Sequence, residues 1–309
     1  MTEPGTVLIT GPTRNLGRHA VLAMADRPPA QRPDLILVGR AGEDLTAVAD
    51  EARARGARVH GIGCDLASLA EVRAAAATVR DLLAAGTVRP LRALVANAGV
   101  LSTDTRRASA DGYELTFAVN HLAHAQLVGD LLGSFSTPAR IVLVGSNTYH
   151  ANVWRRLLRV AEAEWADPVE LARPATGAQP VPGMVAYSTA KLAVLYYAHE
   201  LQRRVGDDVA VAVFEPGWMP GTSLGRGAPA TAQAVSRALG RVPGVSTPRR
   251  SGPLLASVAL DDEWADLRDG AFVVKSRVSE VHPVAHDRDR ERRLWEVTEE
   301  LMTRVTEER

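Results

Sequence analysis

The stretch LITGPTRNLGRHA, residues 8–20, reads as the end of an apolar strand, a tight turn and the start of a helix. Gly11 lets the backbone leave the strand sharply, and Gly17 lets the helix pack close to the strand or to a ligand. Asn15 stands where a third glycine is expected, and asparagine adopts a positive φ more readily than most residues. The helix start offers N–H groups to a pyrophosphate. The stretch therefore predicts a dinucleotide-binding loop, with an ordinary strand–helix turn as the alternative.

The rest of the chain repeats this alternation of short apolar runs and longer helical patterns. Repeated strand–helix units predict an α/β fold with a doubly wound parallel sheet of the Rossmann type, in three α/β/α layers. The strands are almost entirely apolar, as expected when both faces of a sheet are covered. The expected strands are 7–10, 35–38, 59–63, 91–96, 141–145, 209–214 and 271–274, and the expected helices include 16–26, 44–55, 69–84 and 111–132.

Length and composition limit the class of protein. With 309 residues, 46% of them hydrophobic, the chain can bury a sizeable core. The formal net charge is zero, so no nucleic-acid partner is indicated. The single cysteine, Cys64, excludes an internal disulfide, and no metal-ligand cluster is visible. Without a signal pattern or a long apolar run, we expect one domain over residues 1–309, in the cytoplasm and with no membrane span.

Two segments interrupt the alternation, and we interpret both as substrate covers. Residues 147–185 separate a strand from a helix by far more than a short loop, although a surface insertion without a role is the alternative. Residues 219–253 are rich in Gly and Pro, with one helical stretch at 231–239. In the first segment the following side chains are spaced for one face of a helix: Trp154, Leu157, Leu158, Ala161 and Trp165.

The second expected strand ends in LVGRAGEDL, residues 37–45. An acidic residue at this point would bind a ribose 2′-hydroxyl, but the chain has Gly39 and Arg40. Arg14, in the first loop, supplies a second guanidinium. Two arginines at the adenosine end suit a 2′-phosphate, because guanidinium binds phosphate through paired, charge-assisted hydrogen bonds. The sequence thus favours NADP(H), and the alternative is two solvated surface arginines.

Tyr187 and Lys191, in AYSTAK, lie four residues apart and would share one face of a helix. A nearby ammonium stabilises a phenolate, lowers the pKa of the tyrosine and suits its hydroxyl to proton transfer. On its own, such a pair is more often a surface feature. Further polar residues stand near it, because Ser146 ends the strand RIVLVGS at the sheet edge where ligands bind, and its hydroxyl could hold a carbonyl oxygen.

Two other strand ends add to this constellation. In LVANAGV, Asn97, Ala98 and Gly99 follow a strand, and the small residues would let a cofactor approach. In FAVNHLAH, Asn120 lies within an expected helix, where asparagine is a poor helix former and a polar role is plausible.

Taken together, these residues resemble the short-chain dehydrogenase/reductase family over residues 5–225. The motifs that carry the resemblance are TGPTRNLG, CDL, ANAG, Asn120, Ser146, the Tyr187/Lys191 pair and EPGWMPGT, in the family's order. The stretches VNHLAH and YSTAKLAVLYYAHEL, with the long insertion before Tyr187, look most like the retinol-dehydrogenase and protochlorophyllide-reductase-like branch.

The resemblance implies a role for each catalytic residue. Tyr187 would be the general acid that protonates the carbonyl oxygen during reduction, and Ser146 would orient that oxygen. Lys191 would lower the pKa of the tyrosine and hold the ribose of the nicotinamide. Asn120 would anchor the water chain through which Tyr187 regains its proton.

The resemblance also implies cofactor contacts. Asp65 would bind the adenine amino group beside the Leu66 backbone, and Pro216, Gly217 and Thr222 would lie against the nicotinamide and its phosphate. With the residues identified above, the expected contacts are Gly11, Thr13, Arg14, Asn15, Leu16, Gly17, Arg40, Asp65, Leu66, Asn97, Ala98, Gly99, Tyr187, Lys191, Pro216, Gly217 and Thr222.

Three positions depart from the family pattern. Asn15 replaces the middle glycine of the loop, and Ala96 replaces the first asparagine of the family's NNAG. One extra residue precedes Thr222, which puts the role of that threonine in doubt. Because the catalytic positions remain filled, the loop is expected to function.

The expected function is NADPH-dependent reduction of a carbonyl group on an apolar or bulky small molecule. A C=C reductase is a second possibility, but it is disfavoured because that activity is associated with a cysteine near the site, and Cys64 stands at the adenine end. A non-catalytic nucleotide sensor on the same fold is a third possibility, for which the filled catalytic positions would be superfluous.

The remaining features have structural interpretations. His121 and His124 are expected to be packed or surface histidines, and no metal site is expected. The charged C-terminal stretch predicts an amphipathic helix whose Leu294, Val297 and Leu301 face the body of the protein. The family resemblance also implies a homodimer through the helices that hold Asn120 and Tyr187.

Overall fold

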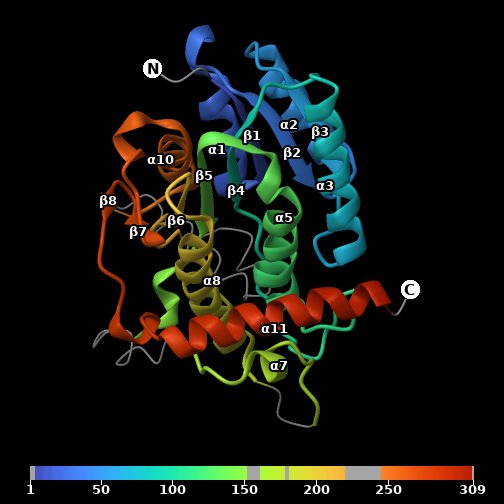
Figure 1. Cartoon of the computed structure of the whole chain (residues 1–309), viewed down its shortest axis with the longest axis vertical. Coiled ribbons are helices and arrows are strands. Elements are labelled where there is room, and N and C mark those ends of the chain that lie inside the picture. Colours follow the sequence, from blue (N-terminus) through green and yellow to red (C-terminus); the bar gives the residue numbers. More distant parts are fainter. Residues whose placement is uncertain (1–3, 152–160, 178–180, 220–244, 308–309) are drawn as a thin grey trace, which may run out of the picture.

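The chain folds around a single twisted sheet with helices on both faces (Figure 1). The computed structural model describes residues 4–151, 161–177, 181–219 and 245–307. The strand order is β3-β2-β1-β4-β5-β6-β7-β8, and every pair is parallel except β7 with β8. The strands are β1 Thr6–Thr10, β2 Asp34–Gly39, β3 Val59–Gly63, β4 Leu91–Ala96, β5 Phe135–Val144, β6 Val209–Glu215, β7 Ala271–Val274 and β8 Arg277–Val278.

Helices form an outer layer on each face of the sheet, which confirms the predicted doubly wound fold. One face carries α1 (Asn15–Ala25), α2 (Glu43–Ala54) and α10 (Pro248–Leu260). The other carries α3 (Leu69–Ala84), α5 (Ala123–Leu131) and α8 (Gly183–Val205). The chain runs outward from β1 to β3 and then crosses back to β4 on the other side of β1. In folds of this type, ligands bind at the carboxyl ends of the strands where the order reverses, which here are β1 and β4.

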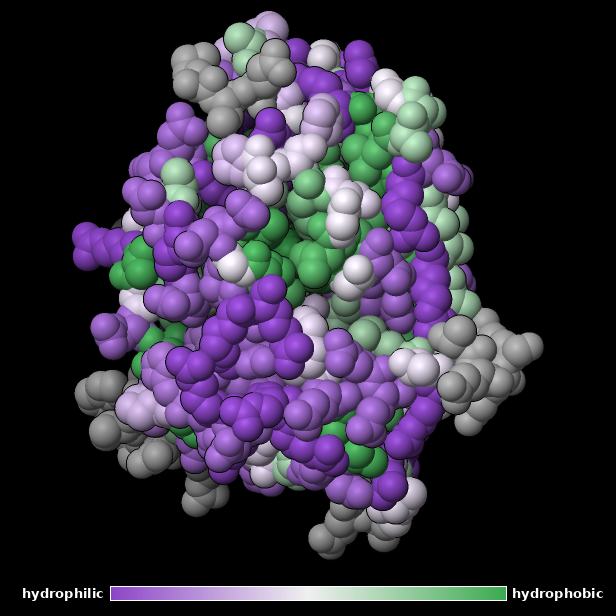
Figure 2. All heavy atoms as spheres, in the orientation of Figure 1, coloured by the Kyte–Doolittle hydropathy of each residue, from purple (hydrophilic) through white to green (hydrophobic). Residues whose placement is uncertain are grey.

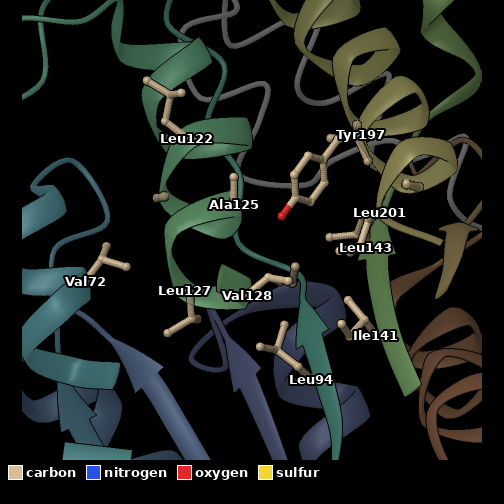
Figure 3. Close-up of a cluster of buried hydrophobic side chains, with 14 of the residues drawn as sticks. Val72, Leu94, Leu122, Ala125, Leu127, Val128, Ile141, Leu143, Tyr197 and Leu201 are labelled. Atoms are coloured by element: carbon tan, nitrogen blue, oxygen red, sulfur yellow. The ribbon is translucent and has the colours of Figure 1, made fainter. Parts of the chain in front are cut away.

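Alternating side chains of the strands build two cores. In β2, Leu35 and Leu37 point to the α1–α2–α10 face, whereas Ile36 points to the α3–α5–α8 face. Figure 3 shows the core on the α3–α5–α8 face, where Leu94 and Ile141 of the sheet lie below side chains of α5 and α8. Both faces of the central strands are therefore dry, which explains their nearly continuous apolar sequence.

The expected strands are present, and the differences have local causes. β5 begins at Phe135, whereas the strand was expected from 141. The sequence did not predict its first residues, FSTPAR, because they lack the apolar pattern of a buried strand. The helix expected over 111–132 starts at Leu115, since Glu114 accepts the N–H of Phe117 as a cap. It comprises α4 (Leu115–Phe117), a π-helical turn (Ala118–Leu122) and α5.

The helix expected in the insertion 147–185 is wrong for the residues that can be described there. Residues 161–167 are not helical, and the short helix α7 (Pro168–Leu171) follows them. Trp165 instead packs edge-on against Tyr196 of α8, with ring centroids 4.7 Å apart. Trp154, Leu157 and Leu158 of that expected helix, and the helical stretch expected at 231–239, lie outside the described residues.

The C-terminal helix α11 (Arg288–Glu307) crosses the outside of α8 and contacts α7 (Figure 1). Leu294, Val297 and Leu301 are at most 3% exposed, as predicted. The outer side of α11 is hydrophilic, whereas hydrophobic side chains gather above it, over α5 and α8 (Figure 2). Among the described helices, none combines the length and the apolar character needed to cross a membrane.

A buried group of charges fastens the start of α11 to α8. Glu291 accepts hydrogen bonds from His199 Nδ1 at 2.9 Å and from Arg203 at 2.6 Å. Arg203 also pairs with Glu200. Burial acts to raise the pKa of Glu291, but the hydrogen bonds from His199 and Arg203 outweigh it and hold that pKa below the usual 4.5.

The Glu291 carboxylate is therefore expected to stabilise the fold. Glu291→Gln keeps the shape of the side chain but removes its charge, and should lower the free energy of unfolding at pH 7 by about 1–3 kcal/mol. Because the pKa of Glu291 is depressed in the folded chain, this contribution is complete above the unfolded pKa and is lost as pH falls through the folded pKa.

Urea unfolding at neutral and acidic pH measures this effect. The gap between the unmodified protein and Glu291→Gln should close in acid. Glu296→Gln, an exposed change on the same helix, is the control and should leave stability within about 0.5 kcal/mol of the unmodified value. Equal stability of Glu291→Gln and the unmodified protein at pH 7 would contradict the assignment.

Candidate active site

The carboxyl ends of β1, β4, β5 and β6 bring most of the predicted site residues to one edge of the sheet. β1 leads into Gly11, β4 into Asn97 and Gly99, β5 into Ser146, and β6 into Pro216. In parallel α/β sheets, ligands bind at this edge, beside the point where the strand order reverses. Thr222 lies outside the described residues.

The glycine-rich loop has the backbone shape that the sequence predicts. Asn15 has φ 47° and Gly11 has φ 63°, so asparagine does occupy the left-handed region in place of a glycine. A Cβ at Gly17 would stand 2.2 Å from the carbonyl oxygen of Gly11. The Arg14 side chain does not cap the start of α1, and the first turn of this helix holds no acidic residue, so the loop fits a dinucleotide pyrophosphate.

Asn97 holds this loop from the neighbouring strand. Its Nδ2 donates to the carbonyls of Thr10 at 2.8 Å and Gly11 at 3.0 Å. The backbone N–H groups of Asn97 and Ala98 both donate to Thr10 Oγ1, each at 3.0 Å. Asn97 was predicted as a cofactor contact, and the structure gives its amide a supporting role in the loop.

The adenosine end is open and charged. Arg40 is exposed, and Arg14 pairs with Asp44 at the start of α2. Asp65 is exposed too, and one of its carboxylate oxygens accepts the N–H of Ala67 at 3.0 Å. The sequence did not single out Asp44, which a 2′-phosphate would have to displace from Arg14.

The position of Cys64 does not support a C=C reductase that uses a cysteine as its acid. It is 2% exposed at the end of β3, in the core beneath the adenosine end. Burial, with the charges of Glu71 and Asp65, raises the pKa of its thiol to about 12. This thiol is a packed core group.

Helix α8 places Tyr187 and Lys191 side by side, as predicted. They are 8% and 4% exposed, and Lys191 Nζ lies 5.6 Å from the centroid of the Tyr187 ring. Lys191 Nζ donates to the carbonyl of Val144 at 2.6 Å. A Cβ built on Gly99 would lie 3.2 Å from Asn120 Oδ1 and 3.9 Å from Lys191 Nζ, so Gly99 keeps space between the two side chains.

The charges around Tyr187 keep its hydroxyl protonated. Burial raises the pKa of Tyr187 to about 12, the negative charge of Glu215 adds to the rise, and a hydrogen bond with Ser146 opposes it. The net shift of the Tyr187 pKa is upward, with burial as its largest cause, so the expected lowering by Lys191 stays a prediction. Burial also lowers the pKa of Lys191 itself to about 8.

Asn120 lies in the π-helical turn and holds the segment that follows β4. Its Oδ1 accepts the N–H of Val100 at 2.8 Å, and its Nδ2 donates to the carbonyl of Val100 at 2.9 Å. Insertions of this kind in a helix are frequent at functional sites. Neither the π-helical turn nor the contact with Val100 is visible in the sequence, because both depend on the packing of α5 against β4.

At the end of β6, Gly217 adopts φ 84° and its N–H donates to Glu215 Oε2 at 2.8 Å. A Cβ at Gly217 would stand 2.1 Å from Ser246 Oγ and 2.6 Å from Lys275 Cε. The carbonyl of Pro216 accepts the Ser251 hydroxyl at 2.8 Å. Glu215 was not predicted as a site residue, although a carboxylate at the end of an apolar strand indicates a functional position.

Comparison with known proteins places the chain among dehydrogenases. The short chain dehydrogenase family profile matches residues 5–155. A Streptomyces protein that carries the name daunorubicin C-13 ketoreductase is 31% identical over 310 residues, covering 96% of this chain and 92% of its own. Human retinol dehydrogenase 13 is 29% identical over 303 residues, covering 95% of this chain and 83% of its own.

Solved structures support the fold. A crystal structure of an uncharacterised protein from Mycobacterium paratuberculosis matches with a TM-score of 0.63 and 24% identity, covering 97% of this chain and 96% of its own. A short chain dehydrogenase from Burkholderia cenocepacia, solved in complex with NADP, matches with a TM-score of 0.62 and 23% identity, covering 87% of this chain and 95% of its own.

The close approach at Gly17 yields a prediction. Gly17→Ala would force its Cβ against the Gly11 carbonyl, and should cost about 1–3 kcal/mol of stability and weaken binding of a nicotinamide dinucleotide. Gly129→Ala, in the open on α5, should instead add up to about 1 kcal/mol and leave binding unchanged. Denaturant unfolding and fluorescence titration measure both, and equal binding by the two variants would argue against the loop.

Proposed function

Because the chain belongs to the short-chain dehydrogenase family of oxidoreductases, we propose that it reduces a carbonyl group of a bulky, apolar small molecule to an alcohol, with NADPH as cofactor. The observation that carries the proposal is the buried pair Tyr187 and Lys191, with Ser146 bonded to the tyrosine, beside a glycine-rich loop. A protonated acid, an orienting hydroxyl and a pyrophosphate cradle are the groups that carbonyl reduction needs.

Each residue has a distinct role in this reaction. When bound, the cofactor supplies a hydride to the carbonyl carbon. Tyr187, whose hydroxyl is kept protonated by burial, donates its proton to the carbonyl oxygen. The Ser146 hydroxyl orients the same oxygen. Lys191 holds the ribose hydroxyls, and Asn120 anchors the path by which Tyr187 regains a proton from solvent.

The preference for NADPH rests on the adenosine end. Arg40 is exposed just beyond β2, and Arg14 is exposed within the glycine-rich loop, so a 2′-phosphate could reach both guanidinium groups once it displaced Asp44 from Arg14. Asp65 and the Leu66 backbone would hold the adenine. Gly99, Pro216 and Gly217 would lie along the nicotinamide, as would Thr222.

The substrate class rests on the relatives and on exposed apolar side chains. Daunorubicin and retinol, in the names of the two relatives, are large and mostly apolar. Trp218, just after the Pro-Gly pair, is 63% exposed, and Met184 at the start of α8 is 38% exposed. We propose that the segments 147–185 and 219–253 cover the substrate within a single domain of residues 1–309.

The first test concerns the cofactor. Arg40→Asp should weaken NADPH binding about tenfold to a hundredfold, because a charge-assisted hydrogen bond to phosphate is worth about 1.5–3 kcal/mol. NADH binding should change little. Arg292→Asp makes the same charge change on the exposed side of α11 and is the control for net charge. Fluorescence titration measures all affinities, and equal affinity of the unmodified protein for NADPH and NADH would refute the preference.

The second test concerns the acid. Tyr187→Phe keeps the ring and removes the hydroxyl, so ketone reduction should fall at least about a hundredfold while NADPH still binds. Tyr196→Phe is the matched control on the same helix, since its hydroxyl donates to the Val284 carbonyl at 2.6 Å. NADPH oxidation is followed with daunorubicin, retinal and simpler ketones, after circular dichroism has verified folding. Near-normal turnover by Tyr187→Phe would require another acid.

The same assay separates the competing functions. A nucleotide sensor would bind NADPH without oxidising it in the presence of any carbonyl compound. A C=C reductase would consume NADPH with conjugated alkenes and leave saturated ketones untouched.

A further inference from the structure

Three segments of the site meet at one buried hydroxyl group, that of Thr10. Thr10 is fully buried at the end of β1. Its Oγ1 lies 3.0 Å from each of the backbone nitrogens of Asn97 and Ala98, and 3.0 Å from Nε2 of His124 on α5. His124 is 4% exposed, and its Nδ1 faces the carbonyl of Asn120 at 3.4 Å.

Hydrogen-bond accounting fixes the direction of each contact. A hydroxyl oxygen has two lone pairs, and the N–H groups of Asn97 and Ala98 occupy both. The Thr10 proton must therefore point to His124 Nε2, which has to be the unprotonated nitrogen of the ring. The ring proton is thus on Nδ1, where it can donate to the Asn120 carbonyl.

The surroundings keep this imidazole neutral. Burial lowers the pKa of His124 to about 4; the Asn120 carbonyl partly opposes the change, and the positive charge of Lys191 adds to it. His121, the nearest titratable neighbour on the same helix, is also held neutral by burial. The direction of the hydrogen bonds is therefore the same across the pH range in which an enzyme assay is run.

His124 closes a ring of hydrogen bonds around the end of β4. Thr10 holds Asn97 and Ala98 from one side, and Asn120 holds Val100 from the other. His124 joins Thr10 to Asn120 and so completes the circuit. It thereby links the glycine-rich loop to the π-helical turn by a route that does not pass through the end of β4.

We propose that His124 is a positioning residue that couples the dinucleotide loop to Asn120, so that cofactor and proton path keep a fixed relative geometry. The proposal rests on the proposed function for its effect on turnover, but not for its effect on the ring tautomer or on cofactor binding. It assigns a function to a residue that the sequence explains only as packing.

Nitrogen NMR of the histidine side chains tests the geometry without any activity. In the protein with no added cofactor, the His124 signal, identified by its loss in His124→Phe, should show the neutral tautomer with the proton on Nδ1 at pH 7. It should remain neutral down to pH 5. A proton on Nε2, or a charged ring at pH 7, would overturn the proposal.

Variants test the coupling. His124→Phe should weaken NADPH binding and lower kcat, each by about fivefold to tenfold, the effect of one lost hydrogen bond. His124→Gln, whose amide oxygen can accept the Thr10 proton, should restore most of the binding but not kcat. Thr10→Val, which also removes the acceptor of the Asn97 and Ala98 N–H groups, should weaken binding at least as much as His124→Phe does, and Thr10→Ser, which keeps the hydroxyl, should not.

His121→Phe is the matched control. His121 is 2% exposed on the same helical segment, but its Nε2 contacts Thr298 of α11 at 2.8 Å and no part of the loop. Its loss should change stability and leave NADPH affinity unchanged. If His121→Phe and His124→Phe reduced affinity alike, the role would be packing alone. An unmodified protein that reduces no carbonyl compound would refute the proposed function, while NMR and NADPH titration would still decide the role of His124.

Discussion

The contact on which the site depends is the close approach of α1 to the end of β1. At Gly17 the helix comes so near the Gly11 carbonyl that a single Cβ would not fit. The Asn97 amide donates hydrogen bonds to the carbonyls of Thr10 and Gly11, so a residue at the end of the neighbouring strand also holds the loop. The Arg14 side chain does not cap the helix start, and N–H groups at the start of a helix attract an anion. The same constraint explains why Asn15 is tolerated: the middle of the loop needs a positive φ, and asparagine supplies it.

The catalytic pair shows how burial sets chemistry. Lys191 is 4% exposed, and the Val144 carbonyl is the partner that compensates its lost hydration. Burial disfavours the charged form of both groups, so it lowers the pKa of Lys191 and raises that of Tyr187. A tyrosine held in its neutral form is ready to give a proton, as reduction requires. Oxidation of an alcohol would need the phenolate, which Glu215 disfavours further. The protonated tyrosine is thus the form from which a carbonyl reduction would start.

The sequence predicted what depends on local pattern. The apolar strands, the glycine-rich loop and the Tyr187/Lys191 spacing follow from periodicity and from backbone preference, and the sheet then brings their ends together. The roles of Thr10 and His124 were not predicted, because they depend on a contact between residues 114 positions apart in the sequence. The sign of the Tyr187 pKa shift was missed for a related reason: the ammonium four residues away is visible in the sequence, but the burial that raises this pKa is not. Trp165 was predicted to lie on a helix because apolar residues precede it at helical spacing. The same spacing also fits a non-helical segment whose tryptophan packs against α8.

Helix α11 limits how the chain can associate. The family resemblance implies dimerisation through the helices that hold Asn120 and Tyr187, but α11 already occupies part of that face. Trp295 of α11 stacks on Tyr197 of α8 with ring centroids 5.3 Å apart, and Thr298 bonds to His121. Removing α11 would expose Leu294, Val297 and Leu301, at about 1.5–3 kcal/mol for each buried side chain. Displacing that helix to free α8 would therefore cost several buried side chains, so α11 is part of the surface that the described residues present on this side of the molecule.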